Sequence, residues 1–197
     1  MKDIGYYLKY VGLFLTVVSL AFLSVFFIRR SLDRKHQLEI MQRFEETLHA
    51  TDDLHNQTYL GATSADKIYF QGDTLALLSI DRLDIKVSVV EGVEKEDLKL
   101  SAGHFPETAM PGKGNFAIAG HSSLVYTCLF NNLKDAVVGD EIFVQTKSGD
   151  HTYEITDIFV VEPDDLSVLD DTDESVITIV TCTNAGKQRK IFRGKEI

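Results

Sequence analysis

The sequence predicts an all-β globular domain, a barrel or a sandwich with one or two short helices, preceded by an N-terminal transmembrane helix and a helical stalk. Three observations carry this prediction. A long uncharged apolar run lies near the N-terminus, a polar segment with one apolar helical stripe follows it, and many short apolar runs separated by turns fill the remainder. We therefore divide the chain of 197 residues into three parts: 1–30, 31–73 and 74–197.

The apolar run extends from Tyr10 to Ile28 and contains no charged residue. Its nineteen residues, at a helical rise of about 1.5 Å, span roughly 28 Å, close to the hydrocarbon thickness of a bilayer. A cleaved signal peptide is the alternative, but its apolar region usually has ~7–15 residues and ends at a small-x-small site. Because this run is longer and ends in Phe27-Ile28-Arg29, we expect an uncleaved transmembrane anchor over residues 1–30.

The juxtamembrane segment 31–73 is polar and largely helical in pattern. Leu38, Met41, Phe44 and Leu48 recur at three- and four-residue spacing, which draws one apolar stripe along a helix. We expect a stalk helix that packs on the globular domain or on a neighbouring chain. The composition of the segment just before residue 73 is that of a linker.

From about Thr74 onward, short β-type runs are separated by Gly, Asp and Pro turns. Many short strands with few long helices are typical of a barrel or a sandwich. The strands are expected near Leu75–Ile80, Lys86–Val90, Phe116–Ala119, Glu141–Thr146, Thr152–Val161, Val176–Thr181 and Arg189–Arg193. Short helices are expected near Lys95–Leu100 and Leu124–Leu133.

Charge and cysteine content exclude several classes of function. The net charge of −10 argues against a nucleic-acid partner, because such proteins need basic patches to neutralise phosphates. Two cysteines, Cys128 and Cys182, are too few for a disulfide scaffold in a chain of this length. We read Cys128 as a core residue. Since the sequence contains no Cys-x-x-Cys pair and no Cys/His pair at zinc spacing, we assign no metal.

Cys182 closes the apolar run Val176–Thr181 and precedes a turn-like segment. A cysteine at the end of a strand lies where functional side chains are commonly held by a rigid sheet. The alternative is a small buried apolar side chain, which is the usual fate of an unpaired cysteine. The neighbourhood of Cys182 alone leaves both interpretations open.

His121 follows another apolar strand, Asn115–Gly120. A thiol needs a nearby base or positive charge to gain thiolate character, and an imidazole can also protonate a leaving group. Two strand ends of one sheet can meet at one edge, which would bring His121 to Cys182. A purely structural histidine is the other interpretation.

Arg189 lies on the strand that follows the cysteine. Hairpin pairing with Val176–Thr181 would bring Arg189 close to Cys182, and alternation places Arg189 and Arg193 on the same face. Attack on an amide carbonyl creates an oxyanion that a fixed guanidinium can stabilise. A solvated basic strand is the alternative.

Three motifs together resemble the sortase family. Thr178-Ile179-Val180-Thr181-Cys182 resembles the sortase signature Thr-Leu-x-Thr-Cys, with Ile179 in the Leu place. Ala119-Gly120-His121 resembles the strand-end histidine motif of the family, and Arg189-Lys190-Ile191-Phe192 resembles its arginine segment. The resemblance covers roughly Thr74 to Ile197. The order His, Cys, Arg behind an N-terminal anchor is strongly specific for this family of Gram-positive surface-protein-anchoring enzymes.

The resemblance implies a sortase-like closed β-barrel and a catalytic role for residues 74–197. By this resemblance Cys182 attacks the Thr–Gly bond of a Leu-Pro-x-Thr-Gly-like sorting signal and forms a thioester, and His121 serves as acid and base. Arg189, rather than Arg193, holds the substrate and the oxyanion. Thr181 is expected to line the site, and His104, which resembles a second histidine of some sortase classes, to be structural or to line the substrate site.

The same resemblance implies the partners and the location. The acyl group is expected to come from surface proteins or pilins that carry the sorting signal. It would pass to an amine of a peptidoglycan bridge or of a pilin lysine. The expected location is the cell membrane, with one span and an extracytoplasmic catalytic domain. The flanking charges conflict with this orientation, because the positive-inside rule would put the more basic C-terminal flank, with Arg29 and Arg30, in the cytoplasm. Long domains can translocate despite such a bias.

Two departures bear on the sortase class. We find no Asp-Pro lid in the stalk and no second C-terminal anchor, which favours cell-wall anchoring over pilin polymerisation. An acidic group resembles the calcium-binding loops of some sortases only in its position, and we interpret it as a solvated charge run, so no cofactor is assigned. This group comprises Glu91, Glu94, Glu96 and Asp97. Two other functions stay open: a membrane-anchored cysteine hydrolase and a non-catalytic peptide-binding β-domain.

Overall fold

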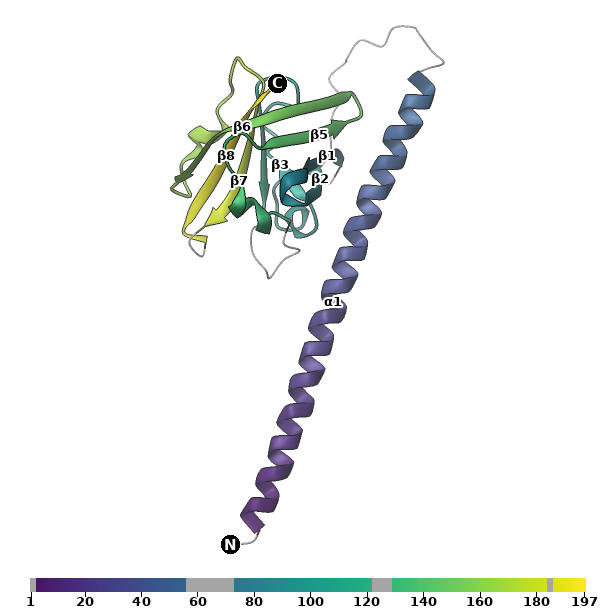
Figure 1. Ribbon diagram of the computed structural model, residues 1–197, viewed down its shortest axis with the longest axis vertical. Coiled ribbons are helices and arrows are strands. Elements are labelled where there is room, and N and C mark those ends of the chain that lie inside the picture. The colour runs from purple at the N-terminus through teal and green to yellow at the C-terminus, as the bar shows by residue number, and fades with distance from the viewer. Residues whose placement is uncertain (1–2, 56–72, 122–128, 184–185) are drawn as a thin grey trace. The chain divides into compact units, whose positions relative to one another are not determined.

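The computed structural model describes residues 3–55, 73–121, 129–183 and 186–197. A long helix, α1 (Asp3–His55), precedes a β-domain (Figure 1). The domain strands are β1 (Thr74–Ile80), β2 (Ile85–Glu91), β3 (Ala102–His104), β4 (Asn115–Gly120), β5 (Glu141–Thr146), β6 (Gly149–Val161), β7 (Val176–Thr183) and β8 (Gln188–Glu196). Short 3₁₀ turns connect them: η1 (Asp81–Leu83), η2 (Asp97–Lys99), η3 (Asn131–Asp135) and η4 (Leu166–Leu169).

The chain divides into two compact units, residues 1–36 and residues 37–197. The boundary falls inside the segment that the sequence predicts as a stalk. In the first unit, Lys9–Arg29 is the one helical segment among the described residues with the length and apolar composition needed to cross a membrane, with a mean hydropathy of 2.6. A signal sequence would pass the same test of length and composition.

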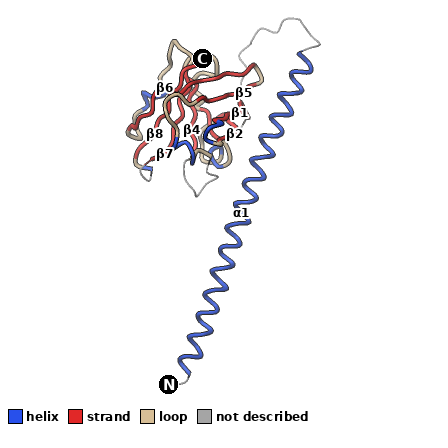
Figure 2. The backbone as a smooth tube through the Cα atoms, viewed as in Figure 1, coloured by secondary structure: helices blue, strands red, loops and turns tan. Residues whose placement is uncertain are grey.

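The second unit contains a closed barrel in the strand order β1-β2-β3-β4-β7-β8-β6-β5, with β5 pairing back onto β1. Figure 2 shows these strands gathered in one β-domain. Most neighbouring strands are antiparallel, but β2 pairs with β3 and β4 pairs with β7 in parallel. Closure satisfies backbone groups that would otherwise stay unpaired at the edges of an open sheet. The predicted all-β barrel is confirmed.

The predicted strands agree with the structure to within a few residues, but the sequence analysis missed β3. Three residues are too few for a visible alternation of apolar and polar side chains. The tertiary context supplies this strand instead, because β3 is held between β2 on one side and β4 on the other. The two predicted helices correspond to the turns η2 and η3, and residues 124–128 of the second prediction lie outside the described residues.

Strict alternation along β4, β7 and β8 separates the core from an outward face. Phe116, Ile118, Ile177, Ile179 and Phe192 point inward and are buried in one apolar cluster. The intervening residues of the same strands therefore project from the opposite, outward face of the barrel wall. This face carries the residues discussed below.

The C-terminal part of α1 packs within the second unit. Phe44 is only 4% exposed, and the Lys147 ammonium lies 5.5 Å from the centre of its ring. Gln37 Nε2 donates to the Leu100 carbonyl at 2.8 Å. Leu38, which the predicted stripe includes, is 47% exposed and lies off the packed face. The C-terminal part of the stalk helix thus packs on the domain, as one of the two expectations had it. The packed face does not include Leu38.

Candidate active site

Cys182 is the last but one residue of β7, and its side chain is exposed. β7 and β8 form the hairpin expected from the sequence, and Cys182 stands directly opposite Arg189 in its register. Since Ile179 points inward, alternation directs Cys182 to the outward face. The thiol therefore lies at the rim of the barrel, on the same face as Arg189.

His121 follows the last residue of β4 directly. The parallel register of β4 and β7 pairs Gly120 with Thr181, so the next residues along the two strands, His121 and Cys182, leave the sheet at the same edge. Parallel strands present successive residues to corresponding faces, so both side chains project outward. His121 and Cys182, 61 positions apart in the sequence, thus lie at neighbouring strand ends on one edge of the sheet.

The environment of His121 favours the neutral imidazole. The side chain is partly buried, and this desolvation lowers the pKa of His121 below its ordinary value of 6.5. Its backbone carbonyl accepts a hydrogen bond of 3.3 Å from the Phe130 amide. The Phe130 ring lies directly over Gly120, where a Cβ atom would come within 2.3 Å of a ring carbon. The absence of a side chain at Gly120 thus allows the Phe130 ring to pack against the end of β4.

The two outward arginines of β8 occupy different ends of the face. The Arg189 guanidinium donates to the carbonyls of Gly186, at 3.0 Å, and Gln188, at 3.3 Å, and so lies at the β7–β8 turn, on the residue that pairs with Cys182. Arg193 stands four strand positions away, roughly 13 Å along β8. Its guanidinium donates to the Val168 carbonyl of η4 at 3.1 Å and lies 5.8 Å from the Phe159 ring centre.

Thr181 and His104 lie behind the outward face. Thr181 is buried, and its hydroxyl donates to the Lys190 carbonyl at 3.3 Å. His104 is buried against Phe116, with ring centres 5.2 Å apart. Its Nδ1 lies 2.9 Å from a carboxylate oxygen of Glu91. Both residues therefore support the wall from inside, and Glu91, a member of the acidic group noted above, is engaged by His104.

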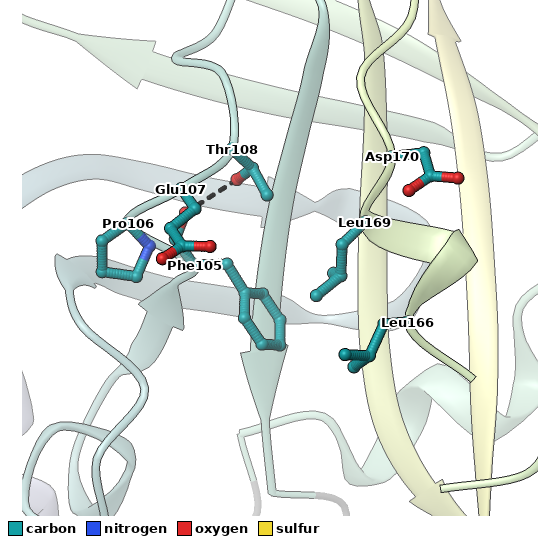
Figure 3. Close-up of a pocket in the computed structure, with 7 residues that line it drawn as sticks. All are labelled: Phe105, Pro106, Glu107, Thr108, Leu166, Leu169 and Asp170. Atoms are coloured by element: carbon teal, nitrogen blue, oxygen red, sulfur yellow. Dashed lines mark hydrogen bonds between the residues drawn. The ribbon is translucent and has the colours of Figure 1, made fainter. Parts of the chain in front are cut away.

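A pocket of about 420 Å³ opens on the outward side, between the segment after β3 and the turn η4. Figure 3 shows Phe105 on one wall and Leu166 and Leu169 on the other, pointing toward one another. The full lining is Phe105, Pro106, Glu107, Thr108, Leu166, Leu169 and Asp170. The Phe105 amide donates to the Ala117 carbonyl at 3.0 Å, which places this wall four residues before His121 on β4. Sequence reasoning did not identify this pocket.

The barrel and this arrangement of side chains define the class of protein, and comparison with known proteins agrees. Residues 78–197 match the family model described as the sortase domain. The chain belongs to the sortase family.

Individual relatives include proteins from several bacteria. Sortase A of Streptococcus agalactiae is 32% identical over 126 residues, which cover 61% of this chain and 51% of that protein. Sortase D of Bacillus subtilis is 27% identical over 134 residues, covering 64% of this chain and 65% of that protein. The solved structure of the Clostridium perfringens sortase D5 transpeptidase superposes with a TM-score of 0.65 at 36% identity, and covers 85% of this chain and 99% of that one.

The shared length limits what these relatives imply. The chain spans about half the length of the first curated relatives it matches, with 55% of the Bacillus anthracis sortase A and 51% of the Streptococcus agalactiae protein covered.

Proposed function

We propose that this chain is a cysteine transpeptidase that cleaves a Leu-Pro-x-Thr-Gly-like sorting signal between Thr and Gly. The released acyl group passes to an amine of the cell wall or of a pilin. The observation that carries the proposal is the convergence of Cys182, His121 and Arg189 at one edge of the barrel, on one face. The transpeptidase named in the Clostridium perfringens structure, which this chain resembles over 85% of its length, supports the same activity.

The first half-reaction uses all three side chains. The neutral imidazole of His121 takes the proton of the Cys182 thiol, and the thiolate attacks the Thr carbonyl carbon. The carbonyl oxygen gains negative charge, which the Arg189 guanidinium stabilises. The C–N bond then breaks, His121 returns its proton to the departing Gly amine, and a thioester joins Thr to Cys182.

The second half-reaction repeats these steps with an acceptor amine. The amine nitrogen attacks the thioester carbonyl and loses its proton to His121, while the C–S bond breaks. The expelled thiolate of Cys182 takes that proton and becomes a thiol again, so the enzyme is regenerated without an external reductant. The exposed position of Cys182 supports access for a bulky acceptor.

The pocket supports the proposed substrate class. Its apolar walls, Phe105 opposite Leu166 and Leu169, suit the Leu and Pro side chains of a sorting signal. Four strand positions separate the wall at Ala117 from His121, which is about 13 Å of extended chain. Three residue steps, about 10 Å of extended chain, separate Leu from Thr in the signal, so a peptide with its Leu in the pocket and its backbone directed toward His121 would place its Thr near this edge of the barrel.

The proposed partners follow from this substrate class. Surface proteins or pilins that bear the signal would supply the acyl group, and a peptidoglycan amine or a pilin lysine would accept it. We place the enzyme at the cell membrane through the apolar helix Lys9–Arg29, with the catalytic domain outside the cytoplasm, where cell-wall acceptors are found.

Trapping the acyl-enzyme tests the proposal directly. The protein is incubated with a panel of sorting-signal peptides that vary the Leu, Pro and x positions, and its intact mass is then measured. We expect an adduct equal to the peptide portion up to Thr, attached to Cys182. Addition of triglycine should convert this adduct to a peptide–triglycine product, whereas release only to water would indicate a hydrolase. Failure to form an adduct with every peptide would contradict the proposed function.

The titration of His121 provides a further prediction. Because burial lowers the pKa of His121, its imidazole should titrate in NMR with a midpoint below 6.5. In the unfolded chain the imidazole binds a proton more readily than in the folded state, so protonation on acidification favours unfolding. The wild-type protein should therefore lose more thermal stability than His121→Gln as the pH falls below 6.5. A midpoint at or above 6.5 would show that the imidazole is not desolvated.

A further inference from the structure

Asn115, the first residue of β4, is a fully buried polar residue that the proposed chemistry does not use; its relative exposure is 0%. Its side-chain nitrogen donates to the carbonyls of Val168 and Asp170, each at 3.0 Å. Its side-chain oxygen accepts a hydrogen bond of 2.7 Å from the Thr178 hydroxyl on β7. Both amide hydrogens and the amide oxygen are thus engaged, which fixes the orientation of the side chain.

The backbone of Asn115 is hydrogen-bonded to the residues that follow each wall of the pocket. Its carbonyl accepts a hydrogen bond of 3.0 Å from the Ala109 amide, just after the Phe105 wall. Its amide donates to an Asp171 carboxylate oxygen at 3.3 Å, just after the η4 wall. Asn115 therefore connects the two segments that carry the opposite walls of the pocket, and the separation of these segments sets its width.

Among the residues that the structure describes, the turn η4 is held to the barrel mainly by side-chain hydrogen bonds to the Val168 carbonyl. Of its four residues only Val168 is buried, and Leu166 is 68% exposed. Arg193 adds a hydrogen bond to the same Val168 carbonyl that Asn115 holds. Since a turn this short forms little internal structure, these side-chain hydrogen bonds to its backbone carry much of its positioning.

We propose that Asn115 is a positioning residue that holds η4 in place and keeps the pocket preformed for the apolar part of the substrate. The proposal rests on the proposed function for the identity of the ligand. A preformed pocket avoids the entropy cost of ordering a loop when the peptide binds. Loss of the Asn115 side chain should therefore weaken peptide binding while the chemistry at Cys182 and His121 proceeds as before.

Steady-state kinetics of peptide cleavage distinguish this role from a general loss of stability. Asn115→Ala should raise KM for the peptide by about tenfold, which corresponds to ~1.4 kcal/mol, with kcat changed by less than roughly threefold. Thr178→Val, which removes the donor to the Asn115 oxygen, should shift KM in the same direction by less, and Thr178→Ser, which keeps the hydroxyl, should restore it. A fall in kcat with KM unchanged would overturn the proposal.

Ser88→Ala is a matched control. Ser88 forms a buried side-chain hydrogen bond of 2.9 Å with Ser101, between β2 and the residue before β3, away from η4. Its loss should lower the melting temperature as the other substitutions do, without a change in KM. An equal rise in KM in Ser88→Ala would assign the effect to stability alone.

Hydrogen exchange without peptide tests the same role independently of activity. In Asn115→Ala, amides of 162–175 should exchange faster than in the wild type, while those of β1 and β2 stay protected. If Asn115→Ala does not fold, the same measurement on Thr178→Val decides. Unchanged exchange of 162–175 would overturn the proposal. Absence of an acyl-enzyme in the wild type would overturn the proposed function instead, and the exchange result would still stand.

Discussion

Cys182→Ala is expected to abolish cleavage of every sorting peptide that the wild-type protein accepts. Without the thiol no thioester forms, so the rate should fall by at least about 10³-fold. The side chain is exposed, so its loss leaves no cavity, and the free energy of unfolding should change by less than ~0.5 kcal/mol. Peptide cleavage followed by chromatography, together with a thermal melt of the same sample, measures both quantities.

Thiol labelling separates this expectation from the non-catalytic alternative. In an enzyme of the proposed kind, Cys182 is accessible to an alkylating reagent, and alkylation should be slowed by a bound sorting peptide. A non-catalytic peptide-binding domain would bind the same peptides equally well as the wild type and as Cys182→Ala. The wild-type domain would show no turnover. Full turnover in Cys182→Ala would contradict the proposed mechanism.

Arg189→Ala is expected to have the second largest effect and is best measured beside Arg193→Ala. Removal of a group that stabilises an oxyanion lowers kcat by about 10²–10³-fold, and Arg189 is the arginine opposite Cys182. Arg193 instead holds the Val168 carbonyl of η4, so Arg193→Ala should act mainly through KM. Both substitutions remove one positive charge from the same face of β8, which makes them a matched pair.

Arg189→Lys refines the test. Lysine keeps the charge but lacks the planar fork of the guanidinium, so we expect partial recovery of kcat relative to Arg189→Ala. A larger loss of kcat in Arg193→Ala than in Arg189→Ala would show that the oxyanion is held from the η4 end of the face.

The two arginines show which features of the site the local sequence pattern predicts. Strand alternation in the sequence already places Arg189 and Arg193 on one face, and the hairpin with the preceding strand already places Arg189 near Cys182. The local pattern does not predict which residues, distant in the sequence, each arginine side chain contacts. The difference between the arginines depends on η4, which reaches Arg193 from the loop between β6 and β7.

His104 and Thr181 show the opposite case. Motif resemblance predicts that Thr181 lines the site and that His104 is structural or lines the substrate site; the structure places Thr181 on the inner side of β7 and His104 against Glu91 and Phe116. The residues next to them in the sequence do not predict this burial, because it depends on segments that are distant in the sequence and pack against them. The role of Asn115 is not predictable from the sequence for the same reason, because the carbonyls that its side chain binds lie more than 50 residues away.

Sequence patterns alone predict the apolar helix, seven of the strands, the faces on which their side chains lie, and the three residues proposed for catalysis. These depend on short-range periodicity and on motifs, which survive without knowledge of the fold. Three features became visible only in the folded chain: the strand β3, the parallel pairing of β4 with β7 that puts His121 and Cys182 at one edge, and the pocket between Phe105 and η4. Parallel pairing needs a crossover between distant segments. Its register is therefore set by packing and hydrogen bonding across the whole barrel, and it cannot be read from the sequence of either strand.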